Sequence, residues 1–503
     1  AGSVIYDATN STATSAVTGL TSDKFQHTNF STAGGKFLVA CNGLDAVQIY
    51  NGTYWFSVAT TGTGATISTI THVGAVATVT TSTAHGLVTG NQVTVSGATP
   101  ADYNGTFLIT VTGTTTFTYT MATTPASNAT VVGSYLPLGI TGVNSNTFIN
   151  VNAYKERLWF TQKNTMKIWY LPTDSIGGAA SAIDFGGIAR NGGYLQAMGT
   201  WTIDAGQGVD DYAAFVTNMG EVIVYAGFDP TDPTNWALRG VWQLGQTFNR
   251  RCFFKWAGDL LLLTQDGIVP LASALQSSRL DPRINLTDKI YYAVSEAASN
   301  YSSFFGWQIN YLAEANMLIL NIPTDSGWQQ FVMHTITKSW AQFTGIQASC
   351  FEISDDRMYF GANGFVGKYY DTNADDGTNI TGYVQQAYSY FDSPGQQKRF
   401  TMVRPIFSTN NGIPSVSVGI NVDFDVQNQL GTATFNPSNT TGSWGSGTWD
   451  TTPWGGGALV VNKIWQGVTG VGYSAGVALS VASQNIDVHW ASSDFVMEAG
   501  GVI

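Results

Sequence analysis

Short apolar runs separated by turns that contain Gly, Asn or Asp recur along most of the chain. Each unit is an apolar strand, such a turn and a second apolar strand, often followed by Tyr or Trp. Six copies occupy residues 35–50, 157–170, 212–225, 259–271, 317–333 and 357–369. Tight turns need backbone with positive φ, which Gly and Asn adopt at little cost. The pattern therefore predicts six β-hairpins.

The spacing of these hairpins predicts a β-propeller. Those that begin near residues 157, 213, 259, 316 and 357 lie roughly 40 to 57 residues apart, close to the period of a blade of four short strands. We interpret each hairpin as the two middle strands of a blade. Weaker runs at 236–242 and 339–343 are expected to supply outer strands. A large meander sandwich with fortuitous spacing is the alternative.

The gap between the first two hairpins is too long for one blade. The excess lies in residues 62–134, which are nearly free of charge and rich in Thr, Val, Ala and Gly. Apolar and polar residues alternate there with the period of a strand, for example in 75–80 and 116–120. We predict a small all-β module, a β-sandwich, inserted into the propeller.

The residue pattern of the chain changes again after about residue 386. Ser393-Pro394-Gly395 marks a break, and alternating runs resume at 415–420 and 477–481. The predicted fold is thus all-β. Its parts are a propeller in 1–61 and 135–385, an insert in 62–134 and a C-terminal β-sandwich or barrel in 386–503. Because the opening residues resemble the middle of a domain, we expect the first propeller part to be incomplete at its N-terminus.

Composition narrows the classes of protein. Only 11% of the 503 residues are charged, against about 25% in an ordinary globular domain, and 13% are aromatic, which excludes a disordered chain. The net charge is −12, so tight wrapping of nucleic acid is disfavoured, although an acidic surface can let nucleic acid pass. No apolar run approaches the roughly 18 residues of a membrane-spanning helix.

Metal and cofactor signals are weak. Cys41, Cys252 and Cys350 stand in apolar strand-like runs and are expected to be buried thiols. Residues 371–377 resemble a calcium loop, but the Gly comes one place late and Gly382 stands where an EF-hand has Glu. A solvated turn is favoured there, and no metal or cofactor is expected.

A glycosidase would need two carboxyl groups about 5 to 10 Å apart in an aromatic cleft. The candidate carboxylates in Gly- or Pro-rich loops are Asp204, Asp210, Asp211, Asp229 and Asp232. Asp is an ordinary turn residue in such loops, and the spacing singles out no pair. We therefore predict no catalytic residue and no enzymatic activity.

Two basic clusters stand out in this charge-poor chain. They are Arg250 with Arg251, and Lys398 with Arg399 and Arg404. We take these five as candidate subunit contacts, with a solvated or salt-bridged face as the alternative. A Trp-rich stretch at 444–454 could stack on sugars, but packing within the C-terminal domain is favoured.

With these features in view, the chain resembles the tail nozzle (tail tubular protein B type) family of short-tailed bacteriophages. The resemblance runs through residues 2–7, 29–35, 51–55, 154–160, 168–172, 199–206, 220–225, 258–260, 265–267, 388–391 and 398–400. The resemblance is specific when the whole chain is considered, but no single motif is specific to the family. Family members usually carry a segment ahead of the strand Ile5-Tyr6-Asp7, and the insert looks like the small β modules that decorate phage tail proteins.

The resemblance implies a structural protein of the virion tail. It implies a homo-hexameric ring below the portal and adaptor that retains the genome and then conducts double-stranded DNA during ejection. Tail fibres or tailspikes, and the host surface at the distal end, are implied as further partners. Rival hypotheses are a phage or secreted propeller that binds or cleaves glycans, and another tail component such as a fibre, hub or adaptor.

Overall fold

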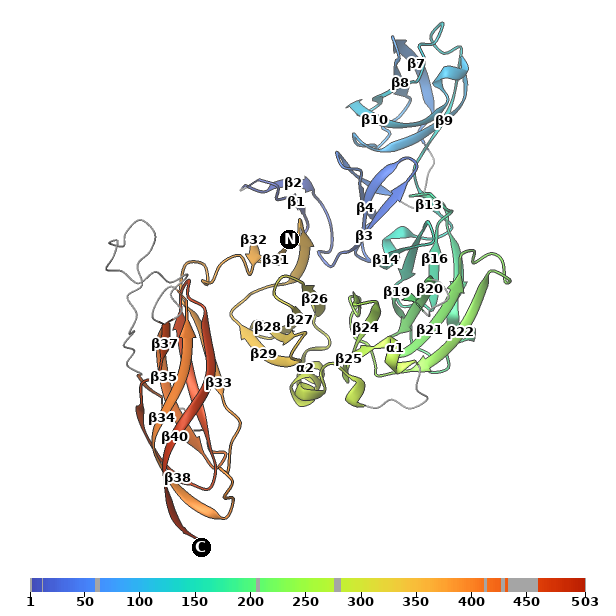
Figure 1. The fold of residues 1–503 in the computed structure, drawn as a ribbon. Coiled ribbons are helices and arrows are strands. Elements are labelled where there is room, and N and C mark those ends of the chain that lie inside the picture. Colours follow the sequence, from blue (N-terminus) through green and yellow to red (C-terminus); the bar gives the residue numbers. More distant parts are fainter. Residues whose placement is uncertain are drawn as a thin grey trace, which may run out of the picture. The chain divides into compact units, whose positions relative to one another are not determined.

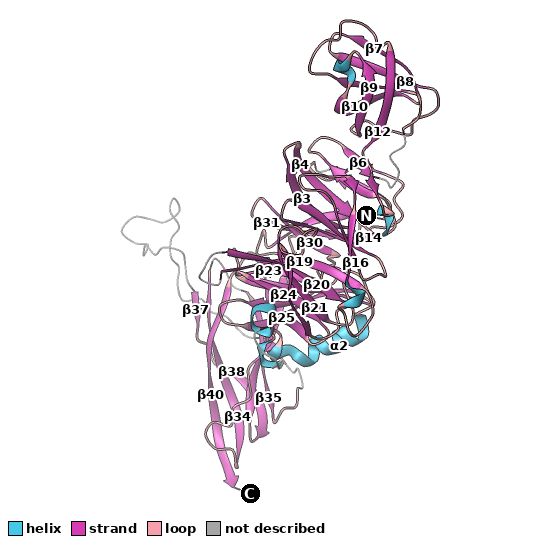
Figure 2. Ribbon diagram, turned by 90° about the vertical axis from the view of Figure 1, so that its right-hand side faces the viewer, coloured by secondary structure: helices cyan, strands magenta, loops and turns pink. Residues whose placement is uncertain are grey.

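The computed structural model describes residues 2–10, 12–58, 64–204, 209–275, 282–410, 414–426, 430–432 and 460–502. These residues form two compact units, 1–367 and 368–503. Strands dominate both units (Figures 1 and 2), and α2 (Tyr291–Tyr301) is the longest helix among the described residues. The expectation of an all-β protein is confirmed.

Six antiparallel sheets follow one another along the first unit. The first three sheets each have four strands: β3 (Gln26–Thr32), β4 (Gly35–Cys41), β5 (Val47–Tyr50) and β6 (Trp55–Val58); β14 (Phe148–Tyr154), β15 (Arg157–Gln162), β16 (Lys167–Tyr170) and β18 (Ser181–Asp184); β19 (Leu195–Asp204), β20 (Val209–Thr217), β21 (Glu221–Gly227) and β22 (Trp236–Gln243). The other three are β23 (Phe253–Trp256), β24 (Asp259–Thr264) and β25 (Gly267–Pro270); β26 (Gln308–Leu312), β27 (Met317–Thr324), β28 (Gly327–His334) and β29 (Ser339–Thr344); β30 (Cys350–Ser354), β31 (Arg357–Ala362) and β32 (Phe365–Tyr369).

This arrangement is β-propeller-like (Figure 1). All six predicted hairpins are neighbouring strands of a sheet, and in the four-stranded sheets they are the two middle strands. The outer strands expected at 236–242 and 339–343 are β22 and β29. The fourth and sixth sheets differ from the expected four-stranded blade, because each has three strands within the described residues.

The sheets are held together by apolar residues on both of their faces. The middle strand β24 is buried along its whole apolar run, from Leu260 to Leu263, because a sheet between two neighbouring sheets has no solvated face. One continuous core joins the third, fourth and fifth sheets and includes α2. Two further cores join the first sheet to the second and the second to the third.

Shorter elements precede the first sheet, lie between the sheets, or, in the case of η1, lie inside the insert. They are the hairpin β1 (Ile5–Asp7) and β2 (Thr14–Val17), the parallel pair β13 (Ile140–Thr141) and β17 (Gly178–Ala179), the helix α1 (Leu271–Ala274), and the 3-10 turns η1 (Ala101–Tyr103), η2 (Ser145–Thr147), η3 (Phe185–Gly187), η4 (Pro282–Ile284) and η5 (Asp288–Ile290).

The insert is a single curled sheet rather than the predicted sandwich. Its strands are β7 (Ile67–Val73), β8 (Val76–Thr81), β9 (Gln92–Thr99), β10 (Gly105–Gly113), β11 (Thr116–Thr120) and β12 (Val131–Pro137), in the order β12-β9-β10-β11-β8-β7. The first half of β10 pairs with β9 and its second half with β11, so β10 joins what would otherwise be two layers. The edges approach each other, since Ala129 N donates to Ile70 O (3.1 Å) and Ala65 N to the Tyr135 hydroxyl (2.9 Å). The module is therefore a nearly closed barrel around its own apolar core.

The C-terminal unit contains two antiparallel sheets. One has the order β33-β39-β35-β36, with β33 (Ile380–Gln385), β39 (Ala475–Ser483), β35 (Ser415–Val422) and β36 (Gly431–Thr432). In the other, β34 (Gln396–Thr409) pairs with β40 (Val488–Val502), β38 (Gln466–Gly472) and β37 (Val460–Asn462). They share a core of valine, leucine and phenylalanine side chains. The unit begins before the expected residue 386, because β33 is already part of it. The Trp-rich stretch 444–454 lies outside the described residues.

Candidate functional site

The first strands of successive sheets lie next to one another around the middle of the propeller-like unit. They carry buried or partly buried amide side chains that bond to the neighbouring sheet. On β14, the Asn150 Oδ1 accepts from Met198 N (3.3 Å) and the Asn152 Nδ2 donates to Met198 O (3.1 Å). On β26, the Gln308 side chain accepts from Phe351 N (3.0 Å) and donates to Phe351 O (2.9 Å). These amides tie β14 to β19 and β26 to β30.

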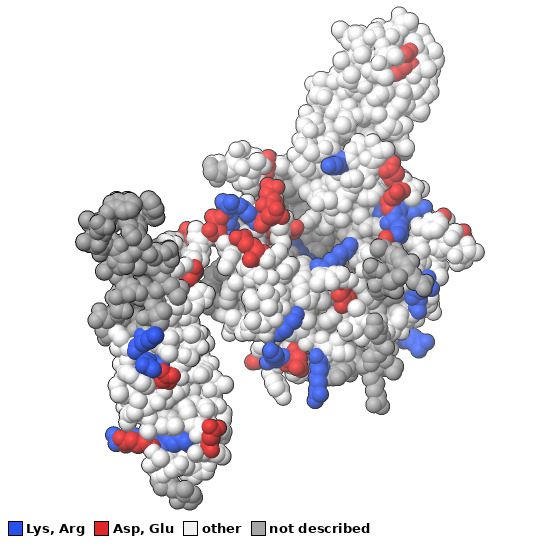
Figure 3. All heavy atoms as spheres, in the orientation of Figure 1, with Lys and Arg blue, Asp and Glu red and all other residues white. Residues whose placement is uncertain are grey.

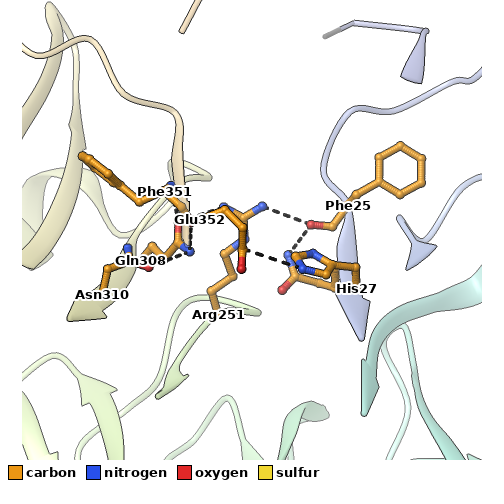
Figure 4. Close-up of polar contacts among 8 residues, drawn as sticks. Phe25, His27, Arg251, Gln308, Asn310, Phe351 and Glu352 are labelled. Atoms are coloured by element: carbon orange, nitrogen blue, oxygen red, sulfur yellow. Dashed lines mark hydrogen bonds and ion pairs between the residues drawn. The ribbon is translucent and has the colours of Figure 1, made fainter. Parts of the chain in front are cut away.

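Arg250 and Arg251, just ahead of β23, extend this network across the middle of the unit. The Arg250 Nη1 donates to Asn42 O, directly after β4 of the first sheet (2.9 Å), and Arg250 O accepts from Asn150 Nδ2 in the second sheet (3.3 Å). The Arg251 Nη2 donates to Phe25 O (3.1 Å), and its Nη1 to the Gln308 Oε1 (3.4 Å). Figure 4 shows the Arg251 guanidinium between these partners. The two arginines thus join sheets that are distant in the sequence.

The same region closes the ring between its first and last sheets. His27 on β3 lies 3.7 Å from Glu352 on β30, and both side chains are largely exposed (45% and 63%). Such an exposed pair contributes less than about 1 kcal/mol. The first and sixth sheets share no strand among the described residues. Next to this seam, Arg251 connects Phe25, just ahead of β3, with Gln308 on β26 of the fifth sheet.

The electrostatics of the two arginines follow from burial. Desolvation lowers the pKa of both guanidinium groups, and the Cys350 thiol and the Glu352 carboxylate oppose this shift at Arg251. The Arg251 guanidinium also lies 5.0 Å from the centre of the Phe305 ring, a favourable cation–π arrangement. Both groups stay cationic at neutral pH, because an arginine pKa starts above 12.

The sequence prediction singled out Arg250 and Arg251 but gave them another role. In the structure these hydrogen bonds all lie within the propeller-like unit, so a subunit contact would have to use the remaining N–H donors of the two guanidinium groups. No sequence signal could have identified Phe25 or Asn42 as partners, because both lie more than 200 residues away.

Lys398 is buried, contrary to its interpretation as a surface contact. It is 3% exposed, and its Nζ donates to the carbonyl oxygens of Ser393 (2.6 Å), Gln396 (2.8 Å) and Tyr473 (3.1 Å). A lysine ammonium has three N–H donors, and all three are used. The side chain points inward together with Phe400, since side chains two apart on a strand share a face.

Arg399 and Arg404 share the outer face of β34, and each already has an acidic partner on β40. Arg399 lies 3.7 Å from Glu498, with both side chains 66% exposed, and the Arg404 Nε donates to Asp494 (2.8 Å). Residues five apart on a regular strand would face opposite sides. The register shift between Phe400 and Met402 brings the two arginines to one face. Their role as subunit contacts stays a prediction.

The carboxylates weighed for glycoside chemistry are held by turn contacts or by a lysine. A hydrogen bond from Lys155 lowers the pKa of Asp211, whose Oδ2 lies 2.5 Å from the Lys155 Nζ. Hydrogen bonds from Thr231 and Thr234 lower the pKa of Asp229 and Asp232. All three are thus kept ionised, whereas a general acid of a glycosidase needs a raised pKa. The side chains of Asp204 and Asp210 lie outside the described part of the chain.

Neither the cysteines nor the calcium-like loop assembles a further site. Cys41 and Cys252 are buried, as expected, and burial raises the pKa of each thiol to about 12, while Cys350 is partly exposed. Within the described ranges, no three His, Cys, Asp or Glu side chains are grouped to hold a metal ion. In the loop 371–377, the Asn373 Nδ2 donates to Asp487 (2.6 Å). No described helix is long and apolar enough to span a bilayer.

Comparison with known proteins adds distant structural matches. No protein-family model and no curated protein matches the chain. Solved structures that match include a candidate 6-phosphogluconolactonase of Bacteroides fragilis (9% identity, TM-score 0.29, 70% of this chain and 96% of that one). They also include the dihydro-heme d1 dehydrogenase NirN (9%, 0.25, 65% and 68%) and Sqt1 of Saccharomyces cerevisiae (10%, 0.23, 72% and 75%). These TM-scores are low, and the β-propeller-like fold of this chain is evident from its own sheets.

Proposed function

We propose that this chain is a structural subunit of the virion tail of a short-tailed bacteriophage, the tail nozzle. Six copies would form a ring below the portal and adaptor that retains the genome and then conducts it during ejection. The observation that carries the proposal is the arginine and amide network at the middle of the propeller-like unit. Its polar side chains bond to neighbouring sheets, which suits a rigid building block.

This network also bears on where a duplex would pass in the proposed nozzle. Arg251 bonds to Phe25, just ahead of β3, and to Gln308 on β26, so its side chain spans the middle of the propeller-like unit. A DNA duplex could not go through that middle without breaking these bonds. In the proposed nozzle the channel is therefore the lumen between copies, closed by heterologous contacts around a ring.

The charge of the chain agrees with a conduit. A net charge of −12 repels phosphate and favours passage over binding. On the face drawn in Figure 3, basic and acidic side chains of the first unit are interspersed rather than gathered by sign. In this proposal the whole chain is a β-propeller with an inserted β module and a C-terminal β-sandwich. The inserted module and the C-terminal domain are then available to contact neighbouring copies, tail fibres or tailspikes, and the host surface.

Gold-labelled antibody against this chain, imaged on intact phage particles, tests the proposal. Label in a ring below the portal, averaging to six copies, is the expected result. Label on fibres or on the capsid, or no label on the particle, would overturn the nozzle assignment.

A further inference from the structure

One outer face of the inserted barrel carries a grid of threonines that the proposed function does not use. Four adjacent strands each contribute two threonines spaced two residues apart. They are Thr69 and Thr71 on β7, Thr78 and Thr80 on β8, Thr116 and Thr118 on β11, and Thr110 and Thr112 on β10. Side chains two apart on a strand point to the same face, so all eight can share the outer surface.

The strand register aligns these threonines into rows across the sheet. Thr71 pairs with Thr78, Thr78 with Thr118, and Thr118 with Thr110, which makes one row of four. A second row contains Thr69, Thr80 and Thr116. Neighbouring strands lie about 4.8 Å apart, and residues two apart on a strand about 6.7 Å apart. The hydroxyls therefore form a periodic array whose shorter repeat runs across the strands.

Hydroxyls on the β7 and β8 side of the grid are available to a ligand. Within the described part of the chain, the hydroxyls of Thr69, Thr71, Thr78 and Thr80 have no hydrogen-bond partner. Thr69 and Thr71 are exposed, and Thr78 and Thr80 partly so. Each hydroxyl can both donate and accept, and each threonine also presents a methyl group.

The charge of the module restricts the ligand. Asp102 is the one charged residue between positions 64 and 137, and the Thr123 hydroxyl donates to it (2.5 Å). The module is nearly white in Figure 3, at the top of the view. An anionic polymer would lose water there without gaining a cationic partner, a net cost. An uncharged ligand matches the charge of this face.

We infer that the threonine grid binds an uncharged, extended polysaccharide whose chain runs across the strands. Such a polymer repeats hydroxyl donors and acceptors at a period close to the strand spacing, so successive sugars can meet successive strands of one threonine row. The methyl groups cover the apolar C–H faces of the sugar rings. This inference does not rest on the nozzle assignment, because it concerns one face of a single chain.

Two glucose hexamers that differ in linkage test the geometry with the full-length chain. Cellohexaose is extended, whereas maltohexaose has the same composition but coils. We expect cellohexaose to bind, measured by isothermal titration calorimetry or saturation-transfer NMR, and maltohexaose to bind at least roughly tenfold more weakly. No binding of either hexamer, or equal binding of both, would overturn the inference.

Threonine-to-valine variants then locate the site. The double variant Thr71→Val and Thr78→Val removes two of the available hydroxyls from one row and keeps the shape of both side chains. It should weaken cellohexaose binding roughly tenfold or more. The matched control is Thr94→Val with Thr106→Val, a cross-strand pair on β9 and β10 outside the grid. Unchanged binding in the grid variant, or equal loss in the control, would also overturn the inference. Circular dichroism checks that both variants fold.

Discussion

Arg251 donates from its Nη2 to the carbonyl oxygen of Phe25 across 3.1 Å, although the two residues are 226 positions apart in the chain. Phe25 directly precedes β3 of the first sheet, whereas Arg251 belongs to the approach to the fourth. The same guanidinium reaches Gln308, whose amide pairs with the backbone of β30 in the sixth sheet. Arg251 thereby connects the start of the first sheet to the fifth sheet directly, and to the sixth sheet through Gln308.

Arg251→Ala should destabilise the first unit by about 2 to 4 kcal/mol. Two hydrogen bonds to a charged donor are lost, and the Phe25 carbonyl is left without this partner. Arg251→Lys should retain only part of this stabilisation, because lysine has no planar guanidinium group that can reach both acceptors. Calorimetric unfolding of the full chain measures the effect, since its two compact units can unfold separately. Arg399→Ala is the control, as its exposed ion pair should matter by less than about 1 kcal/mol. Equal effects of the two alanine variants would contradict this role.

Local turn chemistry explains how far the sequence could predict the fold. Hairpin positions followed from Gly and Asn in the turns, and Gly220 and Asn164 indeed have positive φ (84° and 55°). Pairings between strands that are distant in the sequence have no comparable signal in the residue types. The crossing of β10 from one partner strand to another, which closes the insert into a barrel, depends on register rather than on any residue type.

The basic residues were recognised by type, but their surroundings were not predictable. Lys398 is in the inward series of β34, where its ammonium meets three carbonyls, one of them in Tyr473 far along the chain. The bulge after Phe400 changes which side chains face outward, and the sequence does not mark it. A charge cluster in sequence therefore corresponds to one buried lysine, one exposed ion pair and one partly exposed ion pair.

Lys398→Met should lower the stability of the C-terminal unit by about 2 to 4 kcal/mol. Methionine fits the space of the lysine stem but leaves three carbonyl oxygens without their donor. The matched variant Arg399→Met, next in sequence but exposed, should change stability by less than about 1 kcal/mol. Calorimetry of the full chain should show the loss only in the transition of the C-terminal unit. A neutral Lys398→Met would mean that water replaces the ammonium without cost.

Gly220→Ala and Gly258→Ala form a pair that separates two costs of a side chain in a turn. Both glycines have similar positive φ (84° and 79°), so both variants lose roughly 1 kcal/mol or more to backbone strain. Only at Gly220 would the new Cβ overlap backbone, namely the carbonyl oxygens of Leu244 and Gly245; around Gly258 there is open space. Gly220→Ala should therefore lower the unfolding temperature clearly more than Gly258→Ala. A similar decrease in unfolding temperature for both variants would show that the loop after β22 can move away from the new Cβ at little energetic cost.

The three thiols should differ in reactivity. Burial raises the pKa of Cys41 and Cys252 to about 12, so neither forms appreciable thiolate at pH 8, and neither is accessible. Cys350 is partly exposed. With Ellman's reagent the native chain should release about one equivalent of thiolate, and the chain in guanidinium chloride about three. Cys350→Ser should abolish the native signal. Release of more than one equivalent from the native chain would indicate local opening near Cys41 or Cys252.

Asp259 should give the first unit an unusual dependence on pH. Burial raises the pKa of its carboxyl group, against hydrogen bonds from Leu260 N and Ala272 N that lower it. Because the folded pKa lies above the unfolded value near 4, folding is most favoured below the unfolded pKa. This contribution is lost as the pH rises through the folded pKa.

Asp259→Asn isolates that dependence. The asparagine Oδ1 still accepts both backbone N–H groups that the Asp259 Oδ1 accepts, while the charge is gone. At neutral pH the variant should be more stable than the parent, and the difference should shrink as the pH falls toward 4. Unfolding temperatures of both chains between pH 4 and 8 measure it. If the variant is less stable than the parent at pH 7, the charged carboxylate strengthens the two hydrogen bonds by more free energy than its burial costs.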